Sequence, residues 1–153
     1  MSLRRFSVIV LLGCIISSIG VVSLTVPTLA QSRERATIIL KVTGFHSEKG
    51  QVKIAVFNAP EKWPKDPAYS STIDVNSPTV TWKINDVPFG DYAIAIFHDE
   101  NGNGKMDKNF VGMPKEGYGA SNNPKKKKRA PTFDEAKFSL NAPEQTIEIT
   151  LIY

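Results

Sequence analysis

Residues 90–107, with the sequence GDYAIAIFHDENGNGKMD, decide the fold of this chain. Residues 90–97 alternate between two apolar faces of an extended chain, with a tyrosine and two isoleucines on one face and two alanines and Phe97 on the other. A strand that is apolar on both faces is typical of the middle of a sheet that is covered on both sides. We therefore expect a central strand here, followed by a polar loop that contains two glycines.

Shorter segments of alternating apolar and polar residues accompany this strand, at 37–45, 51–56, 70–75, 80–84 and 146–153. Such segments indicate half-buried strands, and the turn-forming residues between them fit short connections. Residues 47–50 predict a hairpin between the first two strands, and residues 85–90 predict a turn. About seven short strands with almost no helical periodicity predict an all-β fold, an antiparallel β-sandwich of immunoglobulin-like or transthyretin-like shape. A small closed barrel is the alternative.

Two segments between the strands have the composition of surface loops. Residues 58–69 hold three prolines around Trp63, which we expect to pack as a lid on one end of the sandwich, with stacking on a ligand as the alternative. Residues 109–123, called the excursion below, contain three glycines and a proline. This composition predicts an ordered but irregular segment.

The amino-terminal segment predicts export. Arg4 and Arg5 precede an apolar run over residues 6–26, and small residues at Thr28 and Ala30 form a cleavage site for a signal peptide. A single membrane anchor is the alternative, because the run is long enough to span a bilayer. We expect residues 1–30 to be a signal peptide, residues 31–153 to be one β-sandwich domain, and the protein to be periplasmic or secreted.

Composition excludes several kinds of site from the mature chain. Cys14 is the only cysteine and lies in the predicted leader, so the mature chain has no disulfide and no thiolate site. The mature chain has 17 basic and 15 acidic residues, and five of the basic ones are Lys125, Lys126, Lys127, Lys128 and Arg129. This distribution gives no general signature of nucleic-acid binding. We expect the basic run to be a solvated loop tip whose only contact is a weak one with anionic surfaces.

The loop after the central strand resembles the calcium loop of an EF-hand. Counted from Asp99, side-chain oxygens fall at positions one, three, five and nine, with a glycine at six and a backbone carbonyl available at seven. Calcium takes six to eight oxygen ligands, and a glycine permits the sharp turn that brings alternate residues inward. The candidate calcium ligands in this loop are Asp99, Asn101, Asn103, the Lys105 carbonyl and Asp107.

Two features separate this loop from an EF-hand. Position twelve is Phe110 instead of glutamate, and a strand precedes the loop instead of a helix. Glu116 and Glu100 are the nearest candidates for the missing acid. With few charged ligands the affinity should be weak, about 0.1–1 mM, as in extracellular modules. The alternative is that Asn101 to Gly104 are only turn residues.

His98 and its neighbours offer a second kind of site. His98 could join a zinc or copper site, but His46 is the only other histidine and no thiolate is available, which favours a hydrogen-bonded structural histidine. His98, Asp99 and Glu116, with Tyr118 nearby, could instead form a small-ligand or acid–base site. No nucleophile motif is present, so an enzyme is the less favoured interpretation.

The chain resembles a known family. Residues 88–107, then 112–119 and 121–123, are similar to exported bacterial proteins classified as domain of unknown function 2141, and the resemblance extends from Thr37 to Tyr153. It implies a β-sandwich exported to the envelope or the medium, with no established activity or ligand. Phe89 replaces an expected second proline, and the lysine run is denser than in the family.

The sequence leaves three hypotheses about function. In the first, an exported non-enzymatic module binds calcium through the loop, which orders the excursion for contact with an unknown envelope or extracellular partner. In the second, His98, Asp99 and Glu116 form a small-ligand or enzymatic site. In the third, the chain is a purely structural envelope module.

Overall fold

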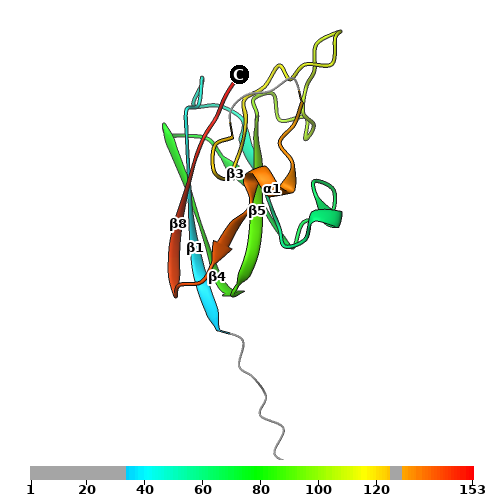
Figure 1. Cartoon of the computed structure of the whole chain (residues 1–153). Coiled ribbons are helices and arrows are strands. Elements are labelled where there is room, and N and C mark those ends of the chain that lie inside the picture. The colour runs from blue at the N-terminus through cyan, green and yellow to red at the C-terminus, as the bar shows by residue number, and fades with distance from the viewer. Residues whose placement is uncertain (1–33, 125–128) are drawn as a thin grey trace, which may run out of the picture. The chain divides into compact units, whose positions relative to one another are not determined.

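Eight strands form two sheets that pack face to face (Figure 1). The computed structural model describes residues 34–124 and 129–153, which belong to the compact unit Ser32–Tyr153. The predicted leader, residues 1–30, and Lys125 to Lys128 lie outside the described residues. Two separate sheets confirm the β-sandwich. Within the described ranges, no helix is long and apolar enough to span a membrane.

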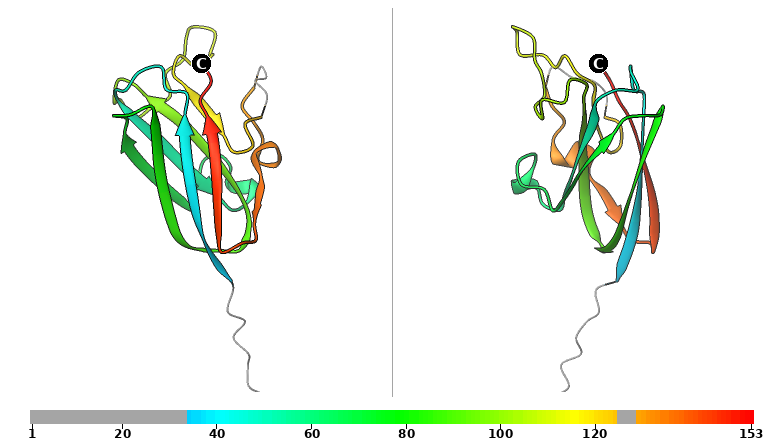
Figure 2. Two further views of the ribbon diagram at one scale, coloured as in Figure 1. Left: turned by 90° about the vertical axis from the view of Figure 1, so that its left-hand side faces the viewer. Right: turned by 180° about the vertical axis from the view of Figure 1, so that it is seen from behind.

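The first sheet has three strands, in the order β4 (Thr79–Pro88), β1 (Arg35–Thr43) and β8 (Glu144–Thr150). β1 lies between the other two, antiparallel to β4 and parallel to β8. Figure 2 shows these three strands side by side. The first and the last strand of the domain are therefore direct neighbours.

The second sheet is built around β5 (Gly90–Asp99), as the two-sided apolar pattern predicts. It has the order β3 (Tyr69–Asp74), β2 (Gln51–Phe57), β5 and β6 (Tyr118–Ala120), and β7 (Phe138–Leu140) pairs with the start of β5 beyond β6. All pairings in this sheet are antiparallel. β5 is thus central, and it carries Asp99 at its very end.

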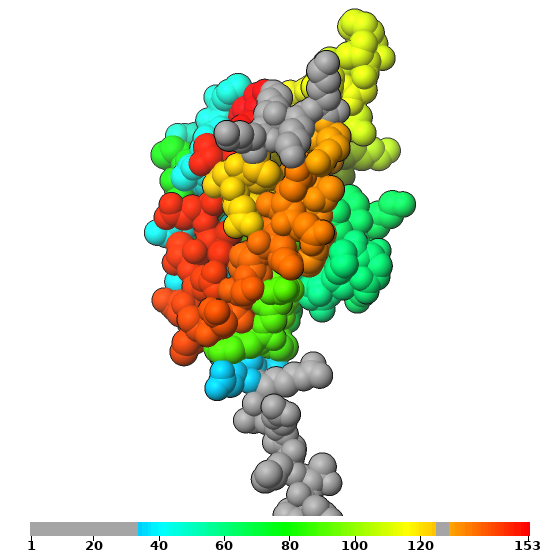
Figure 3. All heavy atoms as spheres, viewed as in Figure 1, coloured from blue at the N-terminus to red at the C-terminus, as the bar shows by residue number. Residues whose placement is uncertain are grey.

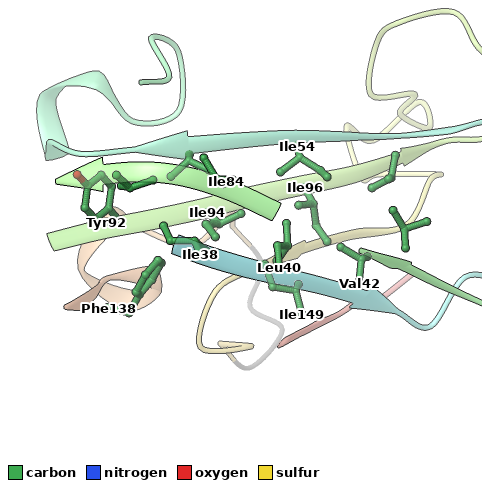
Figure 4. Packing of buried hydrophobic residues seen from close by; sticks show 14 of the residues in the cluster. Ile38, Leu40, Val42, Ile54, Ile84, Tyr92, Ile94, Ile96, Phe138 and Ile149 are labelled. Atoms are coloured by element: carbon green, nitrogen blue, oxygen red, sulfur yellow. The ribbon is translucent and has the colours of Figure 1, made fainter. Parts of the chain in front are cut away.

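The main core lies between the sheets and follows the alternation in the sequence. In β1 every second residue is buried, and in β5 the buried residues on the core side are those that share a face with Tyr92. Figure 4 shows how aliphatic side chains of both sheets interdigitate, among them Leu40, Ile54, Ile94 and Ile149. Burying such side chains stabilises the fold by roughly 1.5–3 kcal/mol each.

A second, smaller cluster covers the outer face of β5. It contains Phe57, Ala93, Ala120 and the short helix α1 (Phe133–Ala136), whose N-terminus is closed by a capping box. Trp63, which follows the 3-10 helix η1 (Pro60–Lys62), packs edge-on against Phe57 and donates a hydrogen bond of 3.1 Å from its Nε1 to the Pro131 carbonyl. Trp63 therefore has the packing role that the sequence predicts, on a sheet face and not at the end of the sandwich.

One predicted turn is wrong, and a second is shorter than predicted. β1 and β2 do not form a hairpin, because they belong to different sheets and the segment between them crosses from one sheet to the other. The turn predicted over residues 85–90 is confined to Phe89, because residues 85–88 belong to β4 and β5 begins at Gly90. A bulge in β4, between the pairings of Ala36 and Ile38, accommodates the Asn-Asp pair, and Asp86 has a φ of 61°. Alternation shows which face of a strand is buried but not which strand is its partner.

Gly50 shows why the crossing segment needs a glycine. Its φ is +73°, and a Cβ there would overlap the Asp99 carbonyl oxygen and lie 2.7 Å from the Glu100 Cα. The Gly50 carbonyl accepts a hydrogen bond of 3.0 Å from the Val75 amide. The backbone of the crossing segment thus packs directly on the strand end that carries the candidate loop.

Gly50→Ala is expected to lower the free energy of unfolding by about 2–5 kcal/mol, because left-handed strain adds to overlap with a backbone that cannot move freely. Gly112→Ala is the matched control, since Gly112 also has a positive φ, +81°, but nothing lies within 4 Å of a Cβ there. The control should lose only about 1–2 kcal/mol. Urea unfolding measures both, and equal losses would show that the close approach at Gly50 is unimportant.

Candidate functional site

Asp99 is a buried carboxylate at the end of β5, and its side chain is inaccessible to solvent. Its Oδ1 accepts a hydrogen bond of 3.0 Å from the Asn103 amide, and its Oδ2 accepts one of 2.7 Å from the Gly104 amide. The Lys53 ammonium of the neighbouring strand lies 3.9 Å from Oδ2. A buried carboxylate requires such partners. Asp99 therefore folds the loop back onto the strand end.

The other candidate ligands of the loop are gathered in one hydrogen-bonded cluster. The side-chain nitrogens of Asn101 and Asn103 donate to the two carboxylate oxygens of Asp107, over 2.7 and 3.2 Å. The oxygen of Asn101 accepts the Asn103 amide at 3.0 Å, and that of Asn103 accepts the Lys105 amide at 2.8 Å. All five candidate positions thus take part in hydrogen bonds within a single loop, Lys105 through its amide.

The two glycines of the loop serve as turn residues. Gly102 and Gly104 have φ values of +71° and +78°, and both face open space. The turn interpretation of the sequence is therefore correct for the backbone. It does not exclude the calcium interpretation, since the same turns bring the side-chain oxygens together.

Glu116 joins the excursion to the loop. It is buried, at 5% exposure, and its two oxygens accept hydrogen bonds from the Glu100 amide at 3.1 Å and the Asp107 amide at 2.9 Å. The sequence singled out Glu116 and Glu100 as the nearest candidates for the missing acid, and the structure brings the Glu116 carboxylate into contact with the loop. Its carboxylate is bound by backbone amides at both ends of the loop, so that it fixes the shape of the loop.

The carboxylates do not form a metal centre on their own. Among the described residues, no group of three or more His, Cys, Asp or Glu side chains is arranged to hold a metal ion. Any cation in the loop would therefore depend on amide and backbone carbonyl oxygens as well as on carboxylates. The Lys105 carbonyl, the predicted backbone ligand, accepts no hydrogen bond from the described residues.

His98 is a buried structural histidine. Its Nε2 donates to the Lys49 carbonyl at 2.6 Å, and its Nδ1 lies 3.0 Å from the Tyr153 hydroxyl. The Tyr153 phenol is protonated at neutral pH, as an ordinary tyrosine is, and burial raises its pKa further, so its hydroxyl can donate to Nδ1. His46 stacks on the Tyr153 ring, with ring centroids 3.4 Å apart. Both ring nitrogens of His98 thus have partners within the protein.

The second hypothesis requires an open site, which these residues do not provide. His98 and Asp99 have no exposed surface, and Glu116 is almost fully buried. A cavity of about 320 Å³ lies nearby and is lined by Tyr118, with Met106, Met113 and Lys108. Tyr118 alone among the four residues of the second hypothesis lines this cavity.

Two residues that hold the site were missed in the sequence. Lys53 belongs to the polar positions of its strand, and Tyr153 to the alternation of the last strand, so neither stood out. Their roles depend on contacts between distant parts of the chain, since Tyr153 is 55 residues from His98. At the basic run, Arg129 forms a bidentate ion pair with Glu135, at 2.8 and 3.0 Å.

Comparison with protein families places the chain. Residues 40–148 match the family described as an uncharacterized protein conserved in bacteria, DUF2141. The chain belongs to this family. The DUF2141 match spans β2, β5, the candidate loop and the excursion. No curated protein and no solved structure matches the chain.

Glu116→Gln is expected to lower the free energy of unfolding by about 1–3 kcal/mol in the presence of a chelator, because glutamine has one acceptor oxygen for two buried amides. The matched control is Glu48→Gln, an exposed carboxylate without a hydrogen bond or ion pair to the described residues. Urea unfolding of both variants provides the comparison. A loss no larger than that of the control would mean that Glu116 does not hold the loop.

Proposed function

We propose that the protein is an exported, non-enzymatic β-sandwich module whose loop from Asp99 to Asp107 binds calcium weakly and orders the excursion as a binding surface. The observation that carries the proposal is the convergence of Asn101 and Asn103 on both oxygens of Asp107, beside the buried Asp99 carboxylate. These side chains occupy the positions that the EF-hand pattern assigns to calcium ligands.

The donor set suits calcium by its chemistry. Carboxylate, amide and backbone carbonyl oxygens are all hard ligands, which calcium prefers and softer metals do not. Rotation of the Asn101 and Asn103 amides would turn their oxygens, in place of their nitrogens, toward Asp107 and a bound cation. Asp99 and Glu116 hold the backbone in place during this change, because backbone amides already bind their oxygens.

The expected calcium affinity suits a protein that works outside the cytoplasm. An ion site with few carboxylates has a dissociation constant of about 0.1–1 mM, which suits extracellular calcium and not the cytoplasm. The predicted signal peptide supports an exported chain. The burial of His98 and Asp99 favours this module over the small-ligand or enzymatic alternative.

Glu116 connects the loop to the excursion, so a bound ion would act on the excursion through this residue. Its oxygens contact the amides of Glu100 and Asp107, and the next residue, Gly117, accepts a hydrogen bond of 2.7 Å from the His98 amide. Ordering the loop therefore orders the start of β6. The purely structural alternative predicts no response to calcium, since every carboxylate of the loop already has a partner.

Calcium is expected to raise the thermal unfolding midpoint of the chain from Gln31 onward. At a calcium concentration ten times the dissociation constant, the free energy of unfolding rises by about 1.4 kcal/mol. In a domain of this size, this raises the midpoint by several degrees. The measurement compares excess chelator, millimolar calcium and millimolar magnesium. Magnesium should give a smaller shift, because it demands stricter octahedral geometry.

Asp107→Asn tests the loop itself. This variant should lose the calcium-dependent shift, as should the double variant Asp99→Asn with Asp107→Asn. Asp66→Asn is the control, since Asp66 pairs with Lys62 on the loop beyond β2 and should keep the full shift. The absence of a calcium-specific shift in the unmodified chain, or its persistence in Asp107→Asn, would refute the calcium site.

A further inference from the structure

The first part of the excursion forms an apolar tip that projects from the sandwich. Phe110 is fully exposed, Val111 is 65% exposed and Met113 is 40% exposed. Among the described residues these are the exposed large hydrophobic side chains. Figure 3 shows the segment as a yellow projection beyond the body of the domain. Soluble proteins rarely expose such groups together without a binding role.

The tip is held in a defined conformation. The Asn109 amide donates to the Met113 carbonyl at 2.8 Å, and the Asn109 side-chain oxygen accepts the amides of Val111 and Met113, both at 3.0 Å. The Gly112 amide returns to the Asn109 carbonyl at 2.9 Å. Below this turn, Lys108 and Pro114 form a β-bridge. The turn thus holds Phe110 and Val111 outward, although burying them would be favourable.

The tip carries two lysines and no acidic residue. Lys105, Lys108 and Lys115 are exposed and form no ion pair with the described residues. No acidic residue lies between Lys108 and Lys115. Asp107 and Glu116 flank the tip in the sequence, and their carboxylates accept hydrogen bonds from amides of the protein and form no ion pair with these lysines. The tip itself, residues 108–115, therefore combines apolar side chains with a formal charge of +2, beside a loop whose carboxylates are negatively charged.

The cavity beside the tip has the same mixed chemistry. Its volume is about 320 Å³, the side chains of Met106, Met113 and Tyr118 line it, and Lys108 adds a positive charge. Methionine side chains adapt to irregular apolar partners. The cavity thus extends the apolar surface of the tip inward, next to a cation that suits a phosphate.

We propose that the tip, residues 108–115, docks on the surface of an anionic phospholipid bilayer. Phe110 and Val111 would enter the boundary between headgroups and acyl chains, and the lysines would stay among the phosphates. A protein partner fits less well, since a stable protein interface uses about 20–30 residues on each side and the tip offers one short turn. This inference rests on the proposed function, because it names the partner of the surface that the loop orders.

Co-sedimentation with vesicles tests the proposal on the chain from Gln31 onward. The chain should bind vesicles of phosphatidylcholine mixed with phosphatidylglycerol and should not bind phosphatidylcholine alone. The double variant Phe110→Ser with Val111→Ser should lose binding and keep its unfolding midpoint, because both side chains are exposed. The conservative variant Phe110→Leu with Val111→Ile should keep binding.

A second pair of variants tests the charge. Lys108→Ser with Lys115→Ser should weaken binding about 25-fold, since each lysine near an anionic surface contributes about a fivefold change in affinity. Lys65→Ser with Lys83→Ser is the matched control, because it removes the same charge from parts of the domain away from the tip, and it should leave binding unchanged. Equal weakening by both pairs would overturn the role of the tip.

Three outcomes would overturn the lipid proposal. The first is no binding to anionic vesicles, and the second is unchanged binding after both tip side chains become serine, which would assign the contact to the basic run. The third is concentration-dependent self-association that the serine variant abolishes, without vesicle binding, which would identify a second copy as the partner. Failure of the calcium proposal is recognised separately, as vesicle binding without any calcium-dependent thermal shift.

Discussion

The structure around the candidate site depends on the burial of one carboxylate. Asp99 has no contact with solvent, and an unpaired charge in that position would cost several kcal/mol. The amides of Asn103 and Gly104 donate hydrogen bonds to this carboxylate. They can reach it only if the chain turns back immediately after β5. The glycines, the asparagines and the short length of the loop all serve this return of the chain.

Glu116 is a second buried carboxylate whose hydrogen-bond partners are backbone amides. It closes the loop by binding the amides of Glu100 and Asp107, and so it attaches the excursion to the sheet edge. With backbone amides as partners, these two acids already stabilise part of the loop without an ion. An ion added to such a loop would replace hydrogen bonds among Asn101, Asn103 and Asp107, and its net effect would be modest. This agrees with a weak site that responds to external calcium.

Much of the fold could be predicted because burial follows alternation, which is local. The faces of β1 and β5 and the central place of β5 follow directly from their sequences. The strand partners of β1 and β2 do not, since the same pattern fits a hairpin and a crossing between sheets. In the site, spacing identified the loop and Glu116, whereas Lys53, Tyr153 and the exposed tip at Phe110 depend on long-range contacts and on exposure that no local pattern encodes.

The parallel pairing of β1 and β8 gives the domain a polarity. Thr43 and Thr150 are paired at the end that carries the loop, and the carboxyl-terminal Tyr153 contacts His46 and His98 there, while Arg35 pairs with Pro88 at the opposite end. Figure 1 shows the carboxyl terminus beside the loops. A chain held through residues before Arg35 would turn Phe110 away from its point of attachment. Such a molecule would bridge two surfaces, whereas a released one could lie on a single surface.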